Sequence, residues 1–126
     1  MANNKQKILL IAALLLPLPS FADKVIGVAD GDTLTVLHAG KPLKIRLADI
    51  DAPEKKQAFG QVSKQSLSDM CFGKDATYQK RTVDRYGRIV ARVTCAGVDV
   101  NREQVDKGLA WVYPRYNRDT NCSFAR

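Results

Sequence analysis

Three short segments of alternating hydrophobicity follow one another between residues 24 and 47, with turn-forming residues between them. They run from Lys24 to Val28, from Thr33 to Leu37 and from Leu43 to Leu47. Alternation with a period of two is typical of strands that are buried on one face, and Asp-Gly and Gly-Lys-Pro sequences are typical of tight turns. The sequence therefore predicts a three-stranded meander at the beginning of the fold.

The following residues predict two helices and a hairpin. Apolar and small side chains recur from Phe59 to Cys71, Val62 among them, at the spacing of one helical face. Asp75–Lys80 and Ile89–Thr94 are expected to pair as strands. A second helix is expected to begin with Asn101 as its N-cap.

This order of elements favours a small α+β fold, a β-barrel with helices. We expect a five-stranded OB-fold Greek-key barrel with two to three helices, one of them between strands three and four. Residues 23–114 form the predicted domain. Residues 115–126 carry no convincing helical pattern, and they are expected to be a C-terminal tail that is truncated or disordered.

Residues 1–22 have the layout of a secretory signal peptide. Lys5 and Lys7 precede the apolar run Ile8–Leu16, and Ser20-Phe21-Ala22 is a small-x-small cleavage site. The run is shorter than the ~20 apolar residues of a membrane span. We therefore expect a secreted or periplasmic protein that is monomeric and has no stable membrane association after cleavage.

Charge and histidine content limit the binding partners and the hydrolytic mechanisms that this chain could have. The whole chain has a net charge of +7, and 18 basic and 13 acidic side chains remain after removal of residues 1–22, which favours an anionic partner such as nucleic acid or an anionic membrane. His38 is the only histidine, which excludes hydrolases and metal sites that depend on several histidines. Hydrolysis by this chain would have to use carboxylates, arginines and a metal ion.

Acidic and basic residues gather at the predicted strand ends, in segments 30–33, 46–54 and 84–88. Clustered carboxylates bind hard cations, and guanidinium groups clamp phosphoryl oxygens. A calcium loop of the EF-hand type is disfavoured because Thr35 and Lys41 replace its Gly and Glu. Paired acids also suit glycosidases, although these do not require neighbouring arginines. The alternative is that these segments have no binding role, since Asp-Gly and Ala-Pro sequences form turns and surface arginines are commonly solvated.

These segments resemble the staphylococcal nuclease (thermonuclease) family over about Val25 to Tyr113. The motifs that carry the resemblance are Asp30-Gly31-Asp32-Thr33, Arg46-Leu47, Asp51-Ala52-Pro53-Glu54, Asp84-Arg85-Tyr86-Gly87-Arg88, and Val100-Asn101 leading to Gly108-Leu109-Ala110. The resemblance implies an OB-fold enzyme that cuts DNA and RNA with Ca²⁺ and leaves 3′-phosphate ends.

The resemblance also implies a role for individual residues. Arg46 and Arg88 match the arginines on the scissile phosphate, and Glu54 matches the acid that activates or orients the attacking water. The remaining matches are calcium-binding carboxylates at Asp32 and Asp51, a carbonyl ligand at Ala52, contacts to a neighbouring phosphate at Arg85 and Tyr86, and a nucleotide-facing tyrosine near Tyr113.

Three departures from the family pattern stand out. The family often has Thr where Ala52 stands, which removes a hydroxyl but keeps the carbonyl. The loop after Glu54 is shorter than in the founding member. No pattern for a third helix follows Tyr113.

The cysteines complete this interpretation. Cys71 is expected to end the first helix and Cys95 the fifth strand, and these two ends are neighbours in the predicted hairpin. A Cys71–Cys95 disulfide is therefore expected, with two buried thiols as the alternative and Cys122 left unpaired.

Two other functions remain open alongside a nuclease. A non-catalytic OB-fold module would bind nucleic acid without cutting it, and a secreted binder of anionic surfaces would need only the charge. The joint presence of Asp32, Arg46, Asp51, Glu54 and Arg88 argues against the non-catalytic module.

Overall fold

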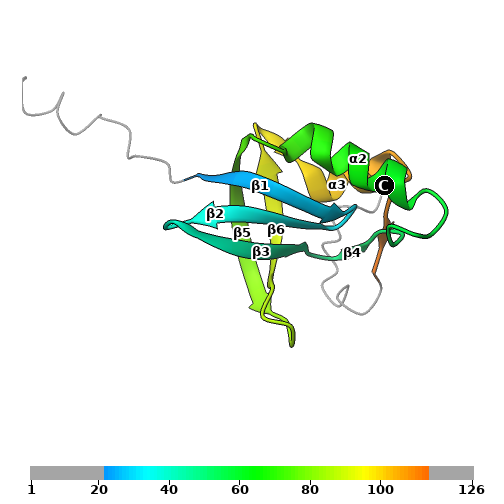
Figure 1. Ribbon diagram of the computed structural model, residues 1–126. Coiled ribbons are helices and arrows are strands. Elements are labelled where there is room, and N and C mark those ends of the chain that lie inside the picture. Colours follow the sequence, from blue (N-terminus) through cyan, green and yellow to red (C-terminus); the bar gives the residue numbers. More distant parts are fainter. Residues whose placement is uncertain (1–21, 114–126) are drawn as a thin grey trace, which may run out of the picture.

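Five long strands form a small closed barrel, and two helices pack beside it (Figure 1). The computed structural model describes residues 22–113, so residues 1–21 of the predicted signal peptide (1–22), the predicted tail 115–126 and Cys122 lie outside the described residues. The strands are β1 (Asp23–Asp30), β2 (Thr33–His38), β3 (Lys41–Leu47), β4 (Ile50–Asp51), β5 (Asp75–Val83), β6 (Ile89–Cys95), β7 (Val98–Asp99) and β8 (Trp111–Val112). The helices are α2 (Gly60–Cys71) and α3 (Val100–Asp106).

The strands follow the order β3-β2-β1-β5-β6-β7, with antiparallel neighbours. The sheet closes because β3 also pairs with β6, in parallel, with Arg46 opposite Val90. The short strands β4 and β8 form a separate antiparallel pair. The predicted five-stranded barrel of the OB type is therefore confirmed, together with a helix between its third and fourth long strands.

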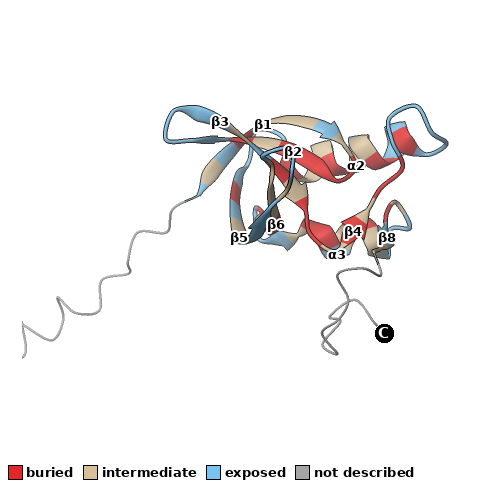
Figure 2. Cartoon of the chain, turned by 90° about the horizontal axis from the view of Figure 1, so that it is seen from below, coloured by how far each residue is buried: buried red, intermediate tan, exposed pale blue. Residues whose placement is uncertain are grey.

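Alternate residues of the barrel strands fill the core. Leu34 and Val36 of β2 and Ile45 of β3 are completely buried, as is Leu67 of α2, while the residues next to them along the strands, such as Thr35, Lys44 and Arg46, are partly buried or exposed (Figure 2). Neither helix in the described part of the chain is long and apolar enough to span a membrane.

The predicted disulfide between Cys71 and Cys95 is present, with Cα atoms 5.3 Å apart. It joins the last residue of α2 to the last residue of β6, and both cysteines are buried. The helix is thus covalently attached to the barrel at the end of the strand that closes it.

The predicted buried stripe of α2 is partly wrong. Phe59 is 73% exposed and Val62 is 55% exposed, and Phe59 precedes the helix with a φ of 61°. The buried face instead consists of Gly60, Ser63, Leu67 and Cys71. The reason is a close approach to the preceding loop, because a Cβ atom on Gly60 would lie 1.9 Å from the carbonyl oxygen of Glu54.

The predicted N-cap of α3 is also wrong. The Asp99 side chain caps the helix by accepting a hydrogen bond from the backbone N–H of Arg102 at 3.2 Å. Asn101 is buried within the first turn, where its Nδ2 donates to the carbonyl of Ala48 and its Oδ1 accepts from the N–H of Val93, both at 3.0 Å. The Asn101 side chain therefore bonds to backbone groups distant in the sequence, although its position in the sequence predicted that it would cap the helix.

Candidate active site

Asp32 lies at the turn between β1 and β2, and neighbouring strands hold it in place. Its Oδ2 accepts a hydrogen bond from the N–H of Ala52 at 2.8 Å, and its Oδ1 accepts one from the Thr33 hydroxyl at 3.0 Å. Its carbonyl accepts from the N–H of Leu47 at 2.8 Å. The carboxylate is buried, so these contacts fix its position relative to β3 and to the segment that follows β4.

Arg46 brings the two predicted metal-binding carboxylates together. Its Nη2 lies 3.3 Å from Asp32 Oδ2 and 3.1 Å from Asp51 Oδ1. Its Nη1 donates to the carbonyls of Leu47 and Ile50, both at 2.8 Å. Because one nitrogen atom contacts both carboxylates, Asp32 and Asp51 face a common point, and that point already attracts a positive charge.

The donors at this point suit a hard cation. Asp32 and Asp51 offer carboxylate oxygens, and the adjacent residue Ala52 offers a backbone carbonyl, so the set contains oxygen alone. Ca²⁺ takes 6–8 oxygen ligands, which leaves positions for water and for a substrate oxygen. Among residues 22–113, no group of three or more His, Cys, Asp or Glu side chains is arranged to hold a metal ion unaided.

Asp30 belongs to a motif that the sequence analysis singled out, but the sequence analysis assigned it no role in the site. Its Oδ1 accepts a hydrogen bond from the N–H of Asp32 at 3.2 Å. Burial, and then the hydrogen bond and negative charge of Asp32, raise the pKa of Asp30 to about 6. The sequence could have indicated this role, because two carboxylates, Asp30 and Asp32, stand two residues apart at a strand end. Their mutual repulsion is a further reason for a cation to bind here.

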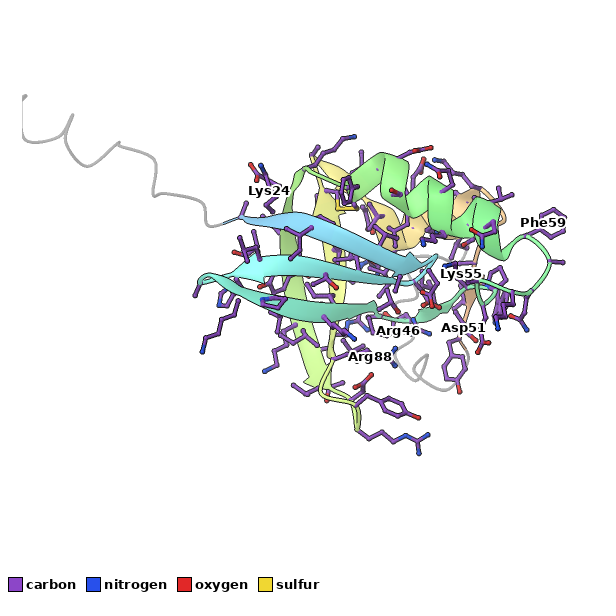
Figure 3. All side chains as sticks on the ribbon, in the orientation of Figure 1. Lys24, Arg46, Asp51, Lys55, Phe59 and Arg88 are labelled. Carbon is purple, nitrogen blue, oxygen red and sulfur yellow. A yellow bond between two sulfur atoms is a disulfide. The ribbon has the colours of Figure 1, made fainter. Side chains whose placement is uncertain are left out.

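Arg88 lies on the same outer face of the barrel as Arg46. Val90 is opposite Arg46 in the parallel β3–β6 pair, and Arg88 precedes Val90 by two residues, so both side chains project from the same side of the sheet. Figure 3 shows Arg46 between Arg88 and Asp51. The closure of the barrel by β3 and β6 therefore places Arg88 on the face that carries Arg46 and the acidic point.

The β5–β6 hairpin holds Arg88 through Asp84. Arg88 Nε lies 2.7 Å from Asp84 Oδ2, and Asp84 Oδ1 accepts from the N–H groups of Tyr86 and Arg88 at 2.9 and 3.0 Å. Burial acts to raise the pKa of Asp84, but the bonds from Arg88 and Tyr86 outweigh it and leave the pKa below its ordinary value. Asp84 thus stays ionised and keeps Arg88 in place.

Arg85 and Tyr86 lie at the tip of this hairpin. The Tyr86 ring is exposed, with the guanidinium carbons of Arg85 and Arg88 at 4.9 and 5.3 Å from its centroid. Arg85 Nη2 also donates to the Tyr86 hydroxyl at 2.7 Å. The tip therefore presents the aromatic face of Tyr86 and the cation of Arg85 next to Arg88.

Glu54 and Tyr113 lie in the segments that follow β4 and β8. Glu54 is exposed in the loop before α2, where its N–H donates to Gln57 Oε1 at 2.7 Å. Tyr113 follows β8, and its N–H donates to the carbonyl of Asp49 at 2.8 Å. The roles predicted for the Glu54 and Tyr113 side chains remain predictions.

Gln104 supports the turn between β1 and β2 from the side of the helices, a role that the sequence analysis did not predict. Gln104 of α3 is fully buried, and its Nε2 donates to the carbonyls of Gly31 and Ser63 at 2.8 and 3.0 Å. A Cβ atom on Gly31 would lie 1.8 Å from the Ser63 hydroxyl oxygen. The turn that carries Asp30 and Asp32 is therefore packed directly against both helices.

Comparison with known proteins identifies the family of this chain. The family model described as "Staphylococcal nuclease homologue" matches residues 44–124. An uncharacterized endonuclease of Haemophilus influenzae is 47% identical over 97 residues, which cover 76% of this chain and 54% of that protein. An uncharacterized endonuclease of Escherichia coli is 44% identical over 97 residues, covering 76% of this chain and 63% of that protein.

A micrococcal nuclease of Shigella flexneri is 37% identical over 121 residues, which cover 86% of this chain and 70% of that protein. The chain thus spans 54% and 63% of the length of the two endonucleases named first, and more of the micrococcal nuclease.

Proposed function

Because the chain belongs to the staphylococcal nuclease family, we propose that it is a secreted or periplasmic, Ca²⁺-dependent endonuclease that hydrolyses phosphodiester bonds of DNA and RNA to 3′-phosphate ends. The observation that carries the proposal is the contact of Asp32 and Asp51 with one nitrogen of Arg46, with Arg88 on the same face. Two arginines beside an all-oxygen cation site are the groups that phosphodiester hydrolysis needs.

Asp32, Asp51 and the Ala52 carbonyl would hold Ca²⁺. When bound, the ion would polarise a phosphate oxygen and make a coordinated water more acidic. The pentavalent transition state concentrates negative charge on the equatorial oxygens of phosphorus. Arg46 and Arg88 would donate N–H groups to these oxygens, in place of the carboxylates that they contact in the free protein.

Glu54 orients the attacking water and accepts its proton in this proposal. The water oxygen forms a bond to phosphorus, and the bond from phosphorus to the 5′ oxygen breaks. The leaving 5′ oxygen takes up a proton from solvent, and the phosphate remains on the 3′ end. The exposed position of Glu54 in the loop before α2 leaves it accessible to water and substrate.

Contacts to the sugar-phosphate backbone dominate this arrangement. Arg85 and Tyr86 would bind a phosphate next to the scissile one, and the exposed Lys55 and Lys56 add positive charge beside Glu54. Phosphate contacts carry no base information, so cleavage is expected to tolerate sequence.

Cleavage assays with Ca²⁺ and with a chelator test the proposal. We expect the protein purified from an exporting host to degrade single-stranded DNA and RNA in Ca²⁺ and to stop when the chelator is added. Arg88→Ala should lower kcat by about 10²–10³-fold, as loss of one transition-state donor does. Arg102→Ala is the matched control, because Arg102 pairs with Asp106 on the surface of α3.

Each other result has a definite meaning. Activity that persists in chelator would contradict the dependence on Ca²⁺. Binding of nucleic acid without cleavage would identify a non-catalytic OB-fold module instead. Equal activity of Arg88→Ala and the control would show that Arg88 has another role.

A further inference from the structure

Trp111 is a large exposed side chain beside the candidate active site. It is the only tryptophan of the chain, and it is 51% exposed. It lies on β8, which runs beside β4 (Figure 2), and the register of this pair places Trp111 directly opposite Asp51. An exposed tryptophan is informative because burial of its ring normally stabilises a protein.

The register places the indole on the same face as the Asp51 carboxylate. Residues directly opposite each other in an antiparallel pair project to the same side, with Cβ atoms about 4.5–5.5 Å apart. The neighbouring pair is Ile50 and Val112, and Ile50 is 1% exposed, so that face of β4 belongs to the core. Asp51 and Trp111 therefore share the outward face, next to Arg46.

Two aromatic side chains consequently flank the arginines. Tyr86 is on the hairpin that carries Arg88, and Trp111 is opposite Asp51. Arg46 lies between Arg88 and Asp51 (Figure 3). A nucleotide chain whose phosphate is bound at Arg46 therefore has one aromatic ring on each side of that phosphate.

We propose that Trp111 stacks on a nucleobase next to the phosphate bound at Arg46, and so favours single-stranded nucleic acid. This inference rests on the proposed nuclease function. Stacking on a protein ring requires a base that has left its own stack, which is easy in a single strand and costly in a duplex. It tolerates sequence because every base has a π face.

The single tryptophan allows a direct binding measurement. Glu54→Gln protein, which keeps the arginines and carboxylates, is titrated in Ca²⁺ with an oligothymidylate and with an abasic oligonucleotide of the same length. We expect the oligothymidylate to quench or shift the Trp111 fluorescence at saturation and the abasic strand to leave it nearly unchanged. Equal responses to the two strands would overturn the proposal.

Kinetics on otherwise wild-type protein provide the second measurement. Trp111→Ala should raise KM for single-stranded DNA by about 5- to 150-fold, as expected for loss of one stacked base, with little change in kcat. Trp111→Phe should restore most of the affinity, and KM for duplex DNA should change less. The matched control is Phe72→Ala, since Phe72 is 58% exposed at the other end of α2 from the loop that carries Glu54.

Failure of this inference is distinguishable from failure of the proposed function. If wild-type protein cleaves DNA in Ca²⁺ and folded Trp111→Ala, checked by circular dichroism, keeps its KM, the stacking role is wrong and the nuclease stands. If wild-type protein does not cleave but only base-containing strands change the fluorescence, the nuclease proposal fails and base stacking on Trp111 stands.

Discussion

At the scale of single residues, the arginines of the site are already engaged by carboxylates. Arg46 contacts Asp32 and Asp51, and Arg88 contacts Asp84. These ion pairs fix the guanidinium groups before substrate arrives, which lowers the cost of ordering them. A phosphate must compete with the same carboxylates, so a cation bound at Asp32 and Asp51 would release Arg46 toward the substrate.

The two polar residues at the start of α3 are expected to differ in their effect on stability. Asn101→Ala removes the partners of buried backbone groups at Ala48 and Val93, and should lower the free energy of unfolding by about 2–3 kcal/mol. Asp99→Ala removes an exposed cap and an ion pair with Arg92, and should lower it by about 1–2 kcal/mol. Urea denaturation measures both. A larger loss for Asp99→Ala would contradict the assignment of the cap.

A cluster of Asp23, His38 and Tyr78 predicts a dependence of stability on alkaline pH. The Tyr78 hydroxyl donates to Asp23 Oδ2 at 2.6 Å, and His38 Nδ1 lies 2.9 Å from the same oxygen. Burial, followed by the bond to Asp23, raises the pKa of Tyr78 to about 12. Because the folded-state pKa exceeds the unfolded value of about 10, the stabilisation is complete below pH 10 and disappears as the pH rises through 12.

Tyr78→Phe tests this dependence. The variant should be less stable than wild type at pH 8, and the difference should shrink between pH 10 and 12, as measured by thermal unfolding at each pH. A difference that is constant across this range would mean that the Tyr78 hydroxyl does not titrate with a raised pKa.

Short motifs were predictable at this scale, whereas residues with distant partners were not. Asp32, Asp51, Arg46 and Arg88 stand in compact segments at strand ends, and the structure places three of them in direct contact. The roles of Asn101 and Gln104 depend on hydrogen bonds to groups far away in the sequence, which no local pattern reveals.

At the scale of elements, α2 shows where periodicity is insufficient. The helix and its end at Cys71 followed the pattern, but its buried face did not include Phe59 or Val62. The close contacts of Gly60 with the Glu54 carbonyl and of Ser63 with Gly31 orient the helix. These contacts are between backbone atoms and small side chains, which a search for apolar spacing overlooks.

The disulfide should stabilise the fold without taking part in catalysis. It closes a loop with a sequence separation of 24 residues, so a Cys71→Ala and Cys95→Ala double variant should lose roughly 3–4 kcal/mol of unfolding free energy. At 25 °C the folded fraction should keep its kcat, because Cys71 and Cys95 end α2 and β6, whereas Glu54 and Arg88 precede the first residues of these elements. Reductant should destabilise wild type and leave the double variant unchanged. An equal effect of reductant on both would point to another target.

At the scale of the whole molecule, the barrel was predictable because its strands and turns are local in sequence. Its closure was not specified by any motif, since β3 and β6 meet across more than 40 residues of chain. Likewise, the placement of Trp111 opposite Asp51 depends on a two-residue pairing between β4 and β8. Such short contacts carry little sequence signal and arise from packing.

Calcium is expected to stabilise the folded molecule. The proposed calcium ligands Asp32 and Asp51 come together only in the native state. Ca²⁺ at a hundredfold excess over its Kd should therefore add about 2.7 kcal/mol to the free energy of unfolding. Asp51→Asn should remove most of this increment, and a chelator should remove it from wild type. Thermal unfolding with and without Ca²⁺ measures the effect. An unchanged increment in Asp51→Asn would exclude Asp51 as a ligand.

The parallel contact between β3 and β6 makes the catalytic arrangement conditional on completion of the barrel. Arg46 and Arg88 become neighbours only when those two strands join. A chain that is still being synthesised, or that crosses a membrane unfolded, would therefore keep the two arginines apart. Such a chain would not cleave the nucleic acids of the cell that makes it. Hydrolysis would begin only where the protein finishes folding.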